Sequence, residues 1–224
     1  MSSMTYADTM NAMRSRHTVR NYLEKPIPAD IQEKLQNEVT RLNQVSGLNM
    51  QLIFNEPGCF QTGMSRYGSF SGVNNYLALA GPKSPKLEEQ AGYYGMKFVL
   101  YAQHLGLNTC FVALTHGKSC AVVGKGEKEA CLVTLGYGVN QSFPHTSRPA
   151  QELCQVTGEV PDWFRRGMEG ALLAPTAVNQ QKFFITYDGD KLKAKVSGRG
   201  FYTKIDLGIV KCSFELASGH TFDE

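Results

Sequence analysis

The chain has 224 residues, of which 42% are apolar and 19% charged, a composition typical of a soluble globular protein that buries a substantial core. Its 23 lysines and arginines exceed its 20 aspartates and glutamates by only three, a bias too small to favour nucleic acid or an anionic membrane as a partner. No apolar run approaches the roughly 20 residues of a transmembrane helix, and residues 1–8 lack the pattern of a signal peptide, so we expect one cytoplasmic domain over residues 1–224.

Helical spacing of apolar residues predicts three helices in the first part of the chain, over residues 5–15, 29–42 and 85–105. Pro28 suits the start of the second helix, and Gly106 suits a left-handed cap after the third. Gly92 and Gly95 in the third helix would let a neighbour approach closely. Apolar runs predict strands at residues 51–54, 76–80, 108–112 and from residue 130 onwards. The segment 56–75, rich in Gly, Ser and Asn, is expected to be a loop.

The last part of the chain predicts a similar series of elements. These are a helix from about residue 162, strands at 183–187 and 191–196, and a helix over 202–217. The order helix, strand and long helix therefore occurs twice, over residues 29–105 and 162–217. This order indicates an internal pseudo-two-fold repeat, with halves 1–155 and 156–224.

The stretch Arg14-Ser15-Arg16-His17-Thr18-Val19-Arg20-Asn21-Tyr22 is dense in hydrogen-bond donors. Guanidinium groups bind phosphate oxygens through charge-assisted, often bidentate hydrogen bonds. The stretch therefore suits a phosphate group. Taken alone, a solvated basic turn after the first helix is the simpler interpretation.

A second polar stretch, Ala174-Pro175-Thr176-Ala177-Val178-Asn179-Gln180-Gln181, lies much later in the chain, and read alone its asparagine is a turn residue before a strand. Together the two stretches resemble the flavin-dependent nitroreductase superfamily. Arg16-His17-Thr18-Val19-Arg20 matches the signature Arg-Arg/His-Ser/Thr-x-Arg/Lys, and Pro175 to Gln181 matches the signature Pro-Ser-x-x-Asn-x-Gln. The resemblance implies an α+β fold, an α/β/α sandwich with a mostly antiparallel sheet.

The resemblance also implies that the chain binds FMN through the residues that match. The expected phosphate contacts are Arg16, His17, Thr18, Arg20 and Arg148. The expected contacts to the ring and ribityl chain are the backbone of Ala113 and Leu114, near the flavin N5, and Pro175, Thr176, Asn179 and Gln181. Arg148 belongs to the polar run His145-Thr146-Ser147-Arg148-Pro149, and without the resemblance it is an exposed arginine before a proline turn.

The order of the two signatures departs from that of ordinary members, in which they lie a few tens of residues apart. Here the Asn signature begins more than 150 residues after Arg20, as in a variant subgroup of the superfamily. The first half lacks the Asn signature, and the second half lacks the basic signature. We therefore expect one complete flavin site per chain, built from both halves. The alternative is a homodimer in which Asn179 serves the flavin of the other chain, so a monomer and a homodimer both remain open.

The sequence shows no pair of nucleophile and base and no paired carboxylates at a recognisable spacing. Its six cysteines lie at irregular spacings, which favours reduced thiols and no metal site. A flavin would supply the chemistry instead. The resemblance implies an oxidoreductase that passes hydride from NAD(P)H through flavin N5 to a small oxidised acceptor, such as a nitroaromatic or a quinone. The alternatives are a flavin-binding or redox-sensing protein with little turnover and a reductive dehalogenase or flavin-fragmenting relative.

Overall fold

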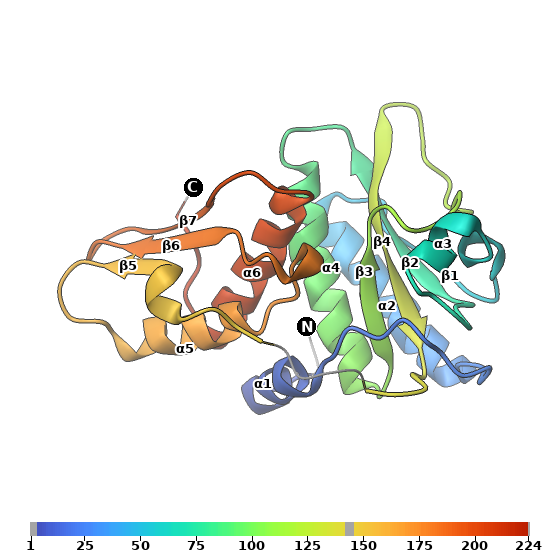
Figure 1. The fold of residues 1–224 in the computed structure, drawn as a ribbon, viewed down its shortest axis with the longest axis horizontal. Coiled ribbons are helices and arrows are strands. Elements are labelled where there is room, and N and C mark those ends of the chain that lie inside the picture. Colours follow the sequence, from blue (N-terminus) through green and yellow to red (C-terminus); the bar gives the residue numbers. More distant parts are fainter. Residues whose placement is uncertain (1–3, 142–145, 224) are drawn as a thin grey trace. The chain divides into compact units, whose positions relative to one another are not determined.

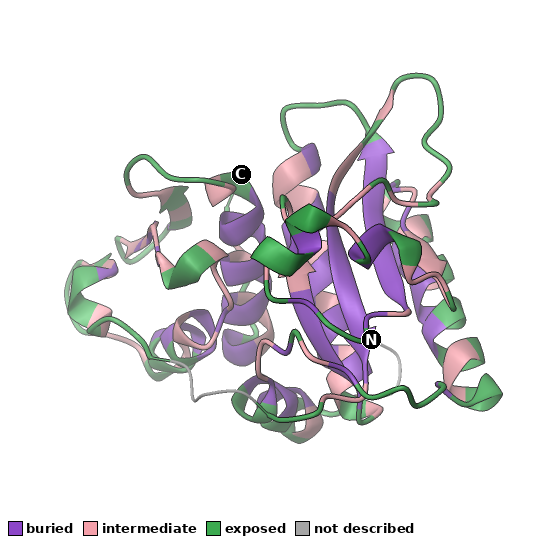
Figure 2. Cartoon of the chain, turned by 45° about the vertical axis from the view of Figure 1, so that its right-hand side comes forward, coloured by how far each residue is buried: buried purple, intermediate pink, exposed green. Residues whose placement is uncertain are grey.

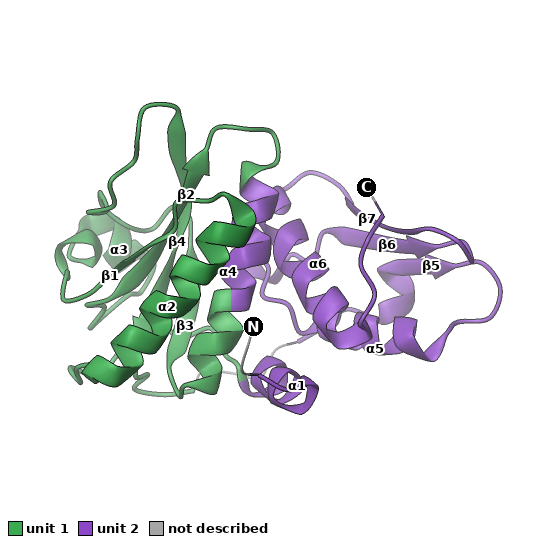
Figure 3. Cartoon of the chain, turned by 180° about the vertical axis from the view of Figure 1, so that it is seen from behind, with its two compact units in different colours: residues 1, 16–87, 98–144 green, residues 2–15, 88–97, 145–224 purple. Residues whose placement is uncertain are grey.

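The structure is a computed structural model that describes residues 4–141 and 146–223 (Figure 1). The chain divides into two compact units, coloured green and purple in Figure 3. Unit 1 comprises residues 16–87 and 98–144, and unit 2 comprises residues 2–15, 88–97 and 145–224. The helix α4 (Leu87–His104) contributes residues to both units, and each unit is described by itself.

Unit 1 is built on a four-stranded antiparallel sheet with the strand order β1-β2-β4-β3. The strands are β1 (Gln51–Ile53), β2 (Tyr76–Pro82), β3 (Asn108–Val112) and β4 (Glu127–Gly136). The apolar run 76–80 forms most of β2 and is fully buried, as Figure 2 shows for the centre of this sheet. All four expected strands are confirmed, although β4 begins before residue 130.

The long helix of unit 1 is α2 (Ala29–Ser46), which begins after Pro28 as expected. It buries an apolar stripe, Leu35, Val39 and Leu42. The helix continues past its expected end at residue 42, so that boundary was wrong. Gly47 ends the helix, because its φ of 70° lies in the left-handed region and its N–H donates to Asn43 O.

The segment 56–75 is not simply a loop. It contains a 3-10 helix, η1 (Gly58–Phe60), and a short helix, α3 (Gly63–Tyr67). A capping box starts α3, in which the Thr62 hydroxyl accepts the Ser65 N–H and the Ser65 hydroxyl accepts the Thr62 N–H. The expectation of a loop was therefore wrong for these residues, since caps and packing rather than apolar periodicity fix a helix this short.

Unit 2 contains a three-stranded sheet with the order β5-β6-β7. β5 (Cys154–Val156) runs parallel to β6 (Phe183–Tyr187), which runs antiparallel to β7 (Leu192–Val196). β6 and β7 confirm the two expected strands. β5 was not predicted, because three residues are too few to show the alternation of apolar and polar residues that indicates a strand. A second 3-10 helix, η2 (Ala150–Glu152), precedes β5.

The helices of unit 2 include α1 (Tyr6–Ser15), α5 (Asp162–Leu172) and α6 (Thr203–Ser218), all three as expected from the sequence. α6 is buried on nearly every side. A Cβ at Gly92 would overlap Ile205 O, and a Cβ at Gly208 would overlap Glu89 O, so these two backbones pack directly on one another. The expectation that Gly92 admits a close neighbour is thus confirmed.

Both units combine helices with open, mainly antiparallel sheets, so the expected α+β class is confirmed. The internal repeat and the halves 1–155 and 156–224 stay predictions, and the two sheets differ in strand number and order. Within the described residues, no helix has both the length and the apolar character needed to cross a membrane.

Candidate functional site

The basic segment, residues 16–22, belongs to unit 1 and has an extended backbone fixed from two sides. The Val19 N–H donates to Thr109 O of β3 at 3.1 Å, and the Tyr22 N–H donates to Ser71 O at 3.0 Å. Thr18 pairs with Thr109 in an isolated parallel bridge. The segment therefore lies along β3, and its side chains project from a backbone that other parts of unit 1 hold in place.

Two side chains anchor this segment in the core. Val19 and Tyr22 are buried together with Phe60, Phe70 and Tyr76 in one apolar cluster. The Tyr22 hydroxyl donates to Val19 O at 2.7 Å and is hydrogen-bonded to Thr134 Oγ1 at 2.8 Å. This anchoring fixes the direction in which the neighbouring polar side chains leave the backbone.

Arg16 is 5% exposed, and its Nε has no hydrogen-bond partner among the residues that the structure describes. Burial lowers the pKa of Arg16 to about 10, so the guanidinium group is still charged at neutral pH. No carboxylate of the described residues pairs with it. A buried charge without a partner is strongly unfavourable, so the surroundings of Arg16 suit an anionic ligand.

The positive charges of Arg20 and Arg16 both act on Cys110 of β3. Burial raises the pKa of the Cys110 thiol to about 11, whereas the charges of Arg20 and Arg16 act to lower it. Arg20 is exposed, and its Cζ lies 5.9 Å from the centre of the Phe70 ring, a cation–π distance. Two guanidinium groups near one strand are the donor set that a phosphate group prefers.

The other predicted residues of unit 1 belong to the basic segment or follow the end of β3. His17 and Thr18 are partly buried, and within the described chain their side chains make no hydrogen bond or ion pair. Ala113 and Leu114 follow directly on the last residue of β3, with Leu114 60% exposed. The structure thus brings the basic segment to β3 and places Ala113 and Leu114 at the end of that strand.

The motif loop, residues 175–181, belongs to unit 2 and has an unusual backbone. Val178, Asn179 and Gln181 have φ values of 46°, 53° and 45°, in the left-handed region. That region costs roughly 1–2 kcal/mol per residue with a side chain, and β-branched residues such as Val178 seldom adopt it. Val178 is 92% exposed, so its own packing does not explain its conformation. Other contacts must hold the loop.

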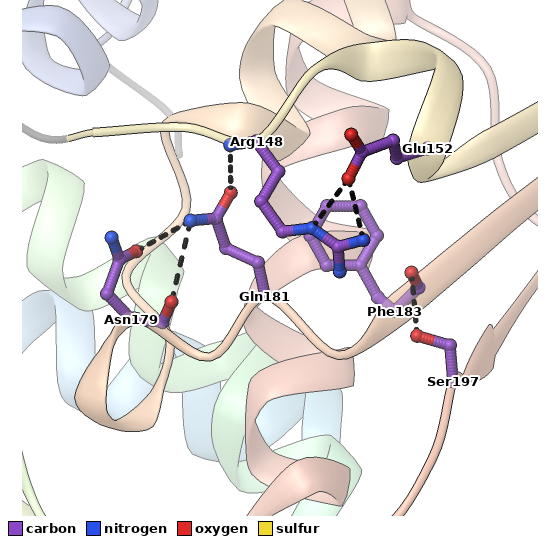
Figure 4. A network of polar contacts seen from close by, with 6 residues as sticks. All are labelled: Arg148, Glu152, Asn179, Gln181, Phe183 and Ser197. Atoms are coloured by element: carbon purple, nitrogen blue, oxygen red, sulfur yellow. Dashed lines mark hydrogen bonds and ion pairs between the residues drawn. The ribbon is translucent and has the colours of Figure 1, made fainter.

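The amide side chains of the motif loop form such contacts (Figure 4). Gln181 is buried, and its Nε2 donates to Asn179 Oδ1 at 3.0 Å and to Thr146 O at 3.1 Å. Its Oε1 accepts the Arg148 N–H at 2.8 Å, and Asn179 Nδ2 donates to Thr146 O at 2.8 Å. Gln181 therefore uses both amide hydrogens within the protein, whereas Asn179 is exposed and one of its amide hydrogens has no partner among the described residues.

The remaining predicted residues of unit 2 lie around the same loop. The Thr176 hydroxyl accepts the Gln181 N–H at 3.0 Å and so closes the loop that begins at Pro175. The Arg148 guanidinium is half-exposed and pairs with Glu152, with an Nη2–Oε2 distance of 2.9 Å. Its expected phosphate role would require Glu152 to share it. His145 lies outside the described residues.

One residue of this region was missed by the sequence analysis. Asp206, in the first turn of α6, is 4% exposed and accepts hydrogen bonds from Ala177 N and Gln180 Nε2 of the motif loop. Its only sequence signal is an acidic residue near a predicted helix start. Among the described residues, no group of three or more His, Cys, Asp or Glu side chains could hold a metal ion.

The amino-acid sequence matches the model of one known protein family. The family described as "Putative TM nitroreductase" matches residues 8–218, nearly the whole chain. The chain belongs to this nitroreductase family. The match spans both the basic segment and the motif loop. A comparison with curated proteins finds no match.

Solved structures show that the nitroreductase fold extends over the chain. A "putative nitroreductase (tm1586)" from Thermotoga maritima has a TM-score of 0.69 at 20% identity and covers 96% of this chain and 85% of its own. A nitroreductase family protein from Streptococcus pneumoniae has a TM-score of 0.51 at 12% identity and covers 64% of this chain and 96% of its own. A "putative NADH oxidase" from Clostridium acetobutylicum has a TM-score of 0.50 at 15% identity and covers 63% of this chain and 96% of its own. At these identities the likeness establishes the fold alone.

Proposed function

We propose that this member of the nitroreductase family is an FMN-dependent oxidoreductase. The observation that carries the proposal is Arg16, a buried and charged guanidinium whose Nε has no partner in the described part of the chain. Together with Arg20 it offers the donors that a flavin phosphate requires. The family match and the "NADH oxidase" description of one structural relative support an oxidoreductase in general.

Bound FMN would supply the redox chemistry, accepting hydride from NAD(P)H at N5 and passing it to a small oxidised acceptor such as a nitroaromatic or a quinone. The residues of the chain would bind and orient it. Arg16 and Arg20 would neutralise the phosphate, with His17 and Thr18 adding hydrogen bonds. The exposed amide of Asn179 would donate to a polar edge of the cofactor, while Gln181 and Thr176 keep the motif loop in shape.

Titration of FMN and riboflavin into apo-protein tests the proposal. Loss of one charge-assisted contact costs about 1.5–3 kcal/mol, so Arg16→Ala should bind FMN roughly ten- to a hundredfold more weakly. Riboflavin, which lacks the phosphate, should bind the parent and the variant equally. Arg165→Ala is the matched control, because Arg165 forms an exposed ion pair with Asp162. If Arg16→Ala discriminates between the two flavins as well as the parent does, the phosphate assignment is wrong.

Steady-state oxidation of NADH and NADPH by the FMN-loaded protein then separates an enzyme from a flavin-binding or redox-sensing protein. The expectation that one chain supplies both signatures stays a proposal based on the sequence. Mixing Arg16→Ala chains with Asn179→Ala chains tests it. Recovery of FMN binding after subunit exchange would show that the two signatures come from different chains.

A further inference from the structure

The left-handed conformation of the motif loop needs a stabilising contact from outside the loop, and α6 provides one. Asp206 Oδ1 accepts the Ala177 N–H at 2.9 Å, and Asp206 Oδ2 accepts Gln180 Nε2 at 2.7 Å. Gln180 Nε2 also donates to Phe201 O at 2.7 Å. The two carboxylate oxygens thus bind on either side of the strained residues Val178 and Asn179.

The surroundings of Asp206 show that it serves the loop rather than its own helix. Among the described residues, its carboxylate accepts hydrogen bonds from Ala177 and Gln180 and from no residue of α6. Burial raises its pKa to about 6, while the hydrogen bonds from Ala177 and Gln180 act to lower it. No charged group of the described residues contributes to this shift. Burial of this carboxylate costs desolvation energy, and within the described part of the chain its hydrogen bonds lead only to the motif loop.

We propose that Asp206 is the positioning residue of the motif loop, holding residues 177–180 in the conformation that exposes the Asn179 amide. The assignment of a ligand to that amide rests on the proposed function, whereas the effect of Asp206 on the loop does not. The test therefore has one arm without flavin and one with it.

The first arm measures amide hydrogen exchange of residues 176–181 in the full-length apo-protein. Asp206→Ala should speed exchange of the Ala177 amide about tenfold or more, because its acceptor is removed. Asp206→Asn keeps one oxygen for Ala177 but presents an N–H to Gln180, so its effect should be smaller. Asp190→Ala, in an exposed turn of the same unit, is the control and should change nothing in the loop. Unchanged exchange in both folded Asp206 variants would overturn the proposal, as would a uniform rise throughout unit 2.

The second arm titrates FMN and riboflavin. Asp206→Ala should weaken both flavins by a similar factor, about tenfold, and alter the visible spectrum of bound flavin, because the loop and not the phosphate site is changed. Gln180→Ala should act through the same contact, so the double variant should lose less than the product of the two single losses. Loosened exchange with unchanged flavin affinity and spectrum would overturn the role of Asp206 in ligand binding. A parent that binds no flavin would overturn the proposed function, while the exchange arm still decides the effect of Asp206 on the loop.

Discussion

The basic segment and the motif loop satisfy their polar side chains in opposite ways. In the basic segment the backbone is hydrogen-bonded on both sides, whereas Arg16 Nε has no partner among the described residues. In the motif loop the backbone is strained, whereas the Gln181 amide is fully engaged with its neighbours. One region thus leaves a buried donor without a partner among the described residues, and the other uses most of its polar side chains to maintain its own shape. Removal of a polar side chain should therefore lower the stability of the apo-protein at Gln181 and raise it at Arg16.

The largest effect is expected for Gln181→Leu. The change removes the hydrogen bonds from the Gln181 amide to Thr146 and Asn179 and leaves the Arg148 N–H without its acceptor, so it should lower the free energy of unfolding by about 3–4 kcal/mol. Urea unfolding of the apo-protein measures this, with Gln155→Leu on an exposed position of β5 as control. A loss no greater than that of the control would mean that the loop does not depend on this network.

The free energy of unfolding should depend on pH through the buried carboxyl group of Asp206. The pKa of Asp206 is raised by burial from 3.8 to about 6, so its neutral form is favoured in the folded state. Its contribution to stability is therefore fully present below pH 3.8 and is lost as the pH rises through about 6. The parent should lose up to about 2–3 kcal/mol relative to Asp206→Asn over that window. Parallel curves for the two proteins in urea unfolding would contradict this.

Arg16→Met should raise the stability of the apo-protein, whereas Gln181→Leu should lower it. It replaces a buried, unpaired charge by an apolar side chain of similar length, so the apo-protein should gain about 1–2 kcal/mol of stability. At the same time the preference for FMN over riboflavin should disappear. Thermal unfolding of apo-protein measures the first effect, and Arg14→Met, at a half-exposed ion pair with Glu169, is the control. A destabilised variant would show that Arg16 has a structural role instead.

Val178→Asn should have the smallest effect. Asparagine adopts the left-handed region more readily than valine, and the side chain of Val178 is 92% exposed. The change should raise the free energy of unfolding by about 0.5–1 kcal/mol and leave the spectrum of bound flavin unchanged. Val139→Asn, at an exposed valine without a positive φ, should bring no such gain.

The sequence predicted most of the fold because the long helices and central strands have strong apolar patterns. α3 and β5 were missed for the opposite reason, since five and three residues carry too little pattern. The capping box of α3 pairs Thr62 with a serine, and the usual signature has Glu or Gln in that place.

The candidate site residues were chosen by residue type, and the sequence did not predict their environments. Arg16 and Arg20 look alike in the sequence, yet one is buried and the other exposed, because the basic segment buries Arg16, Val19 and Tyr22 at every third residue. Neither a β-strand, with a period of two residues, nor an α-helix, with a period of about 3.6, has that spacing. The pairing of Arg148 with Glu152 and the reach of Asp206 to the motif loop depend on tertiary structure, and no local pattern announces them.

The backbone contact between Gly92 and α6 also sets the axial register of Asp206. Gly208 lies two residues beyond it on the same helix, and neither glycine position leaves room for a Cβ. An alanine at either position would force the helices apart or make α6 slide. A slide by one residue is about 1.5 Å, enough to break hydrogen bonds as short as those from Ala177 and Gln180. The absence of a side chain at Gly92 and Gly208 thus fixes the position of Asp206 along the helix axis, and through Asp206 the position of the motif loop.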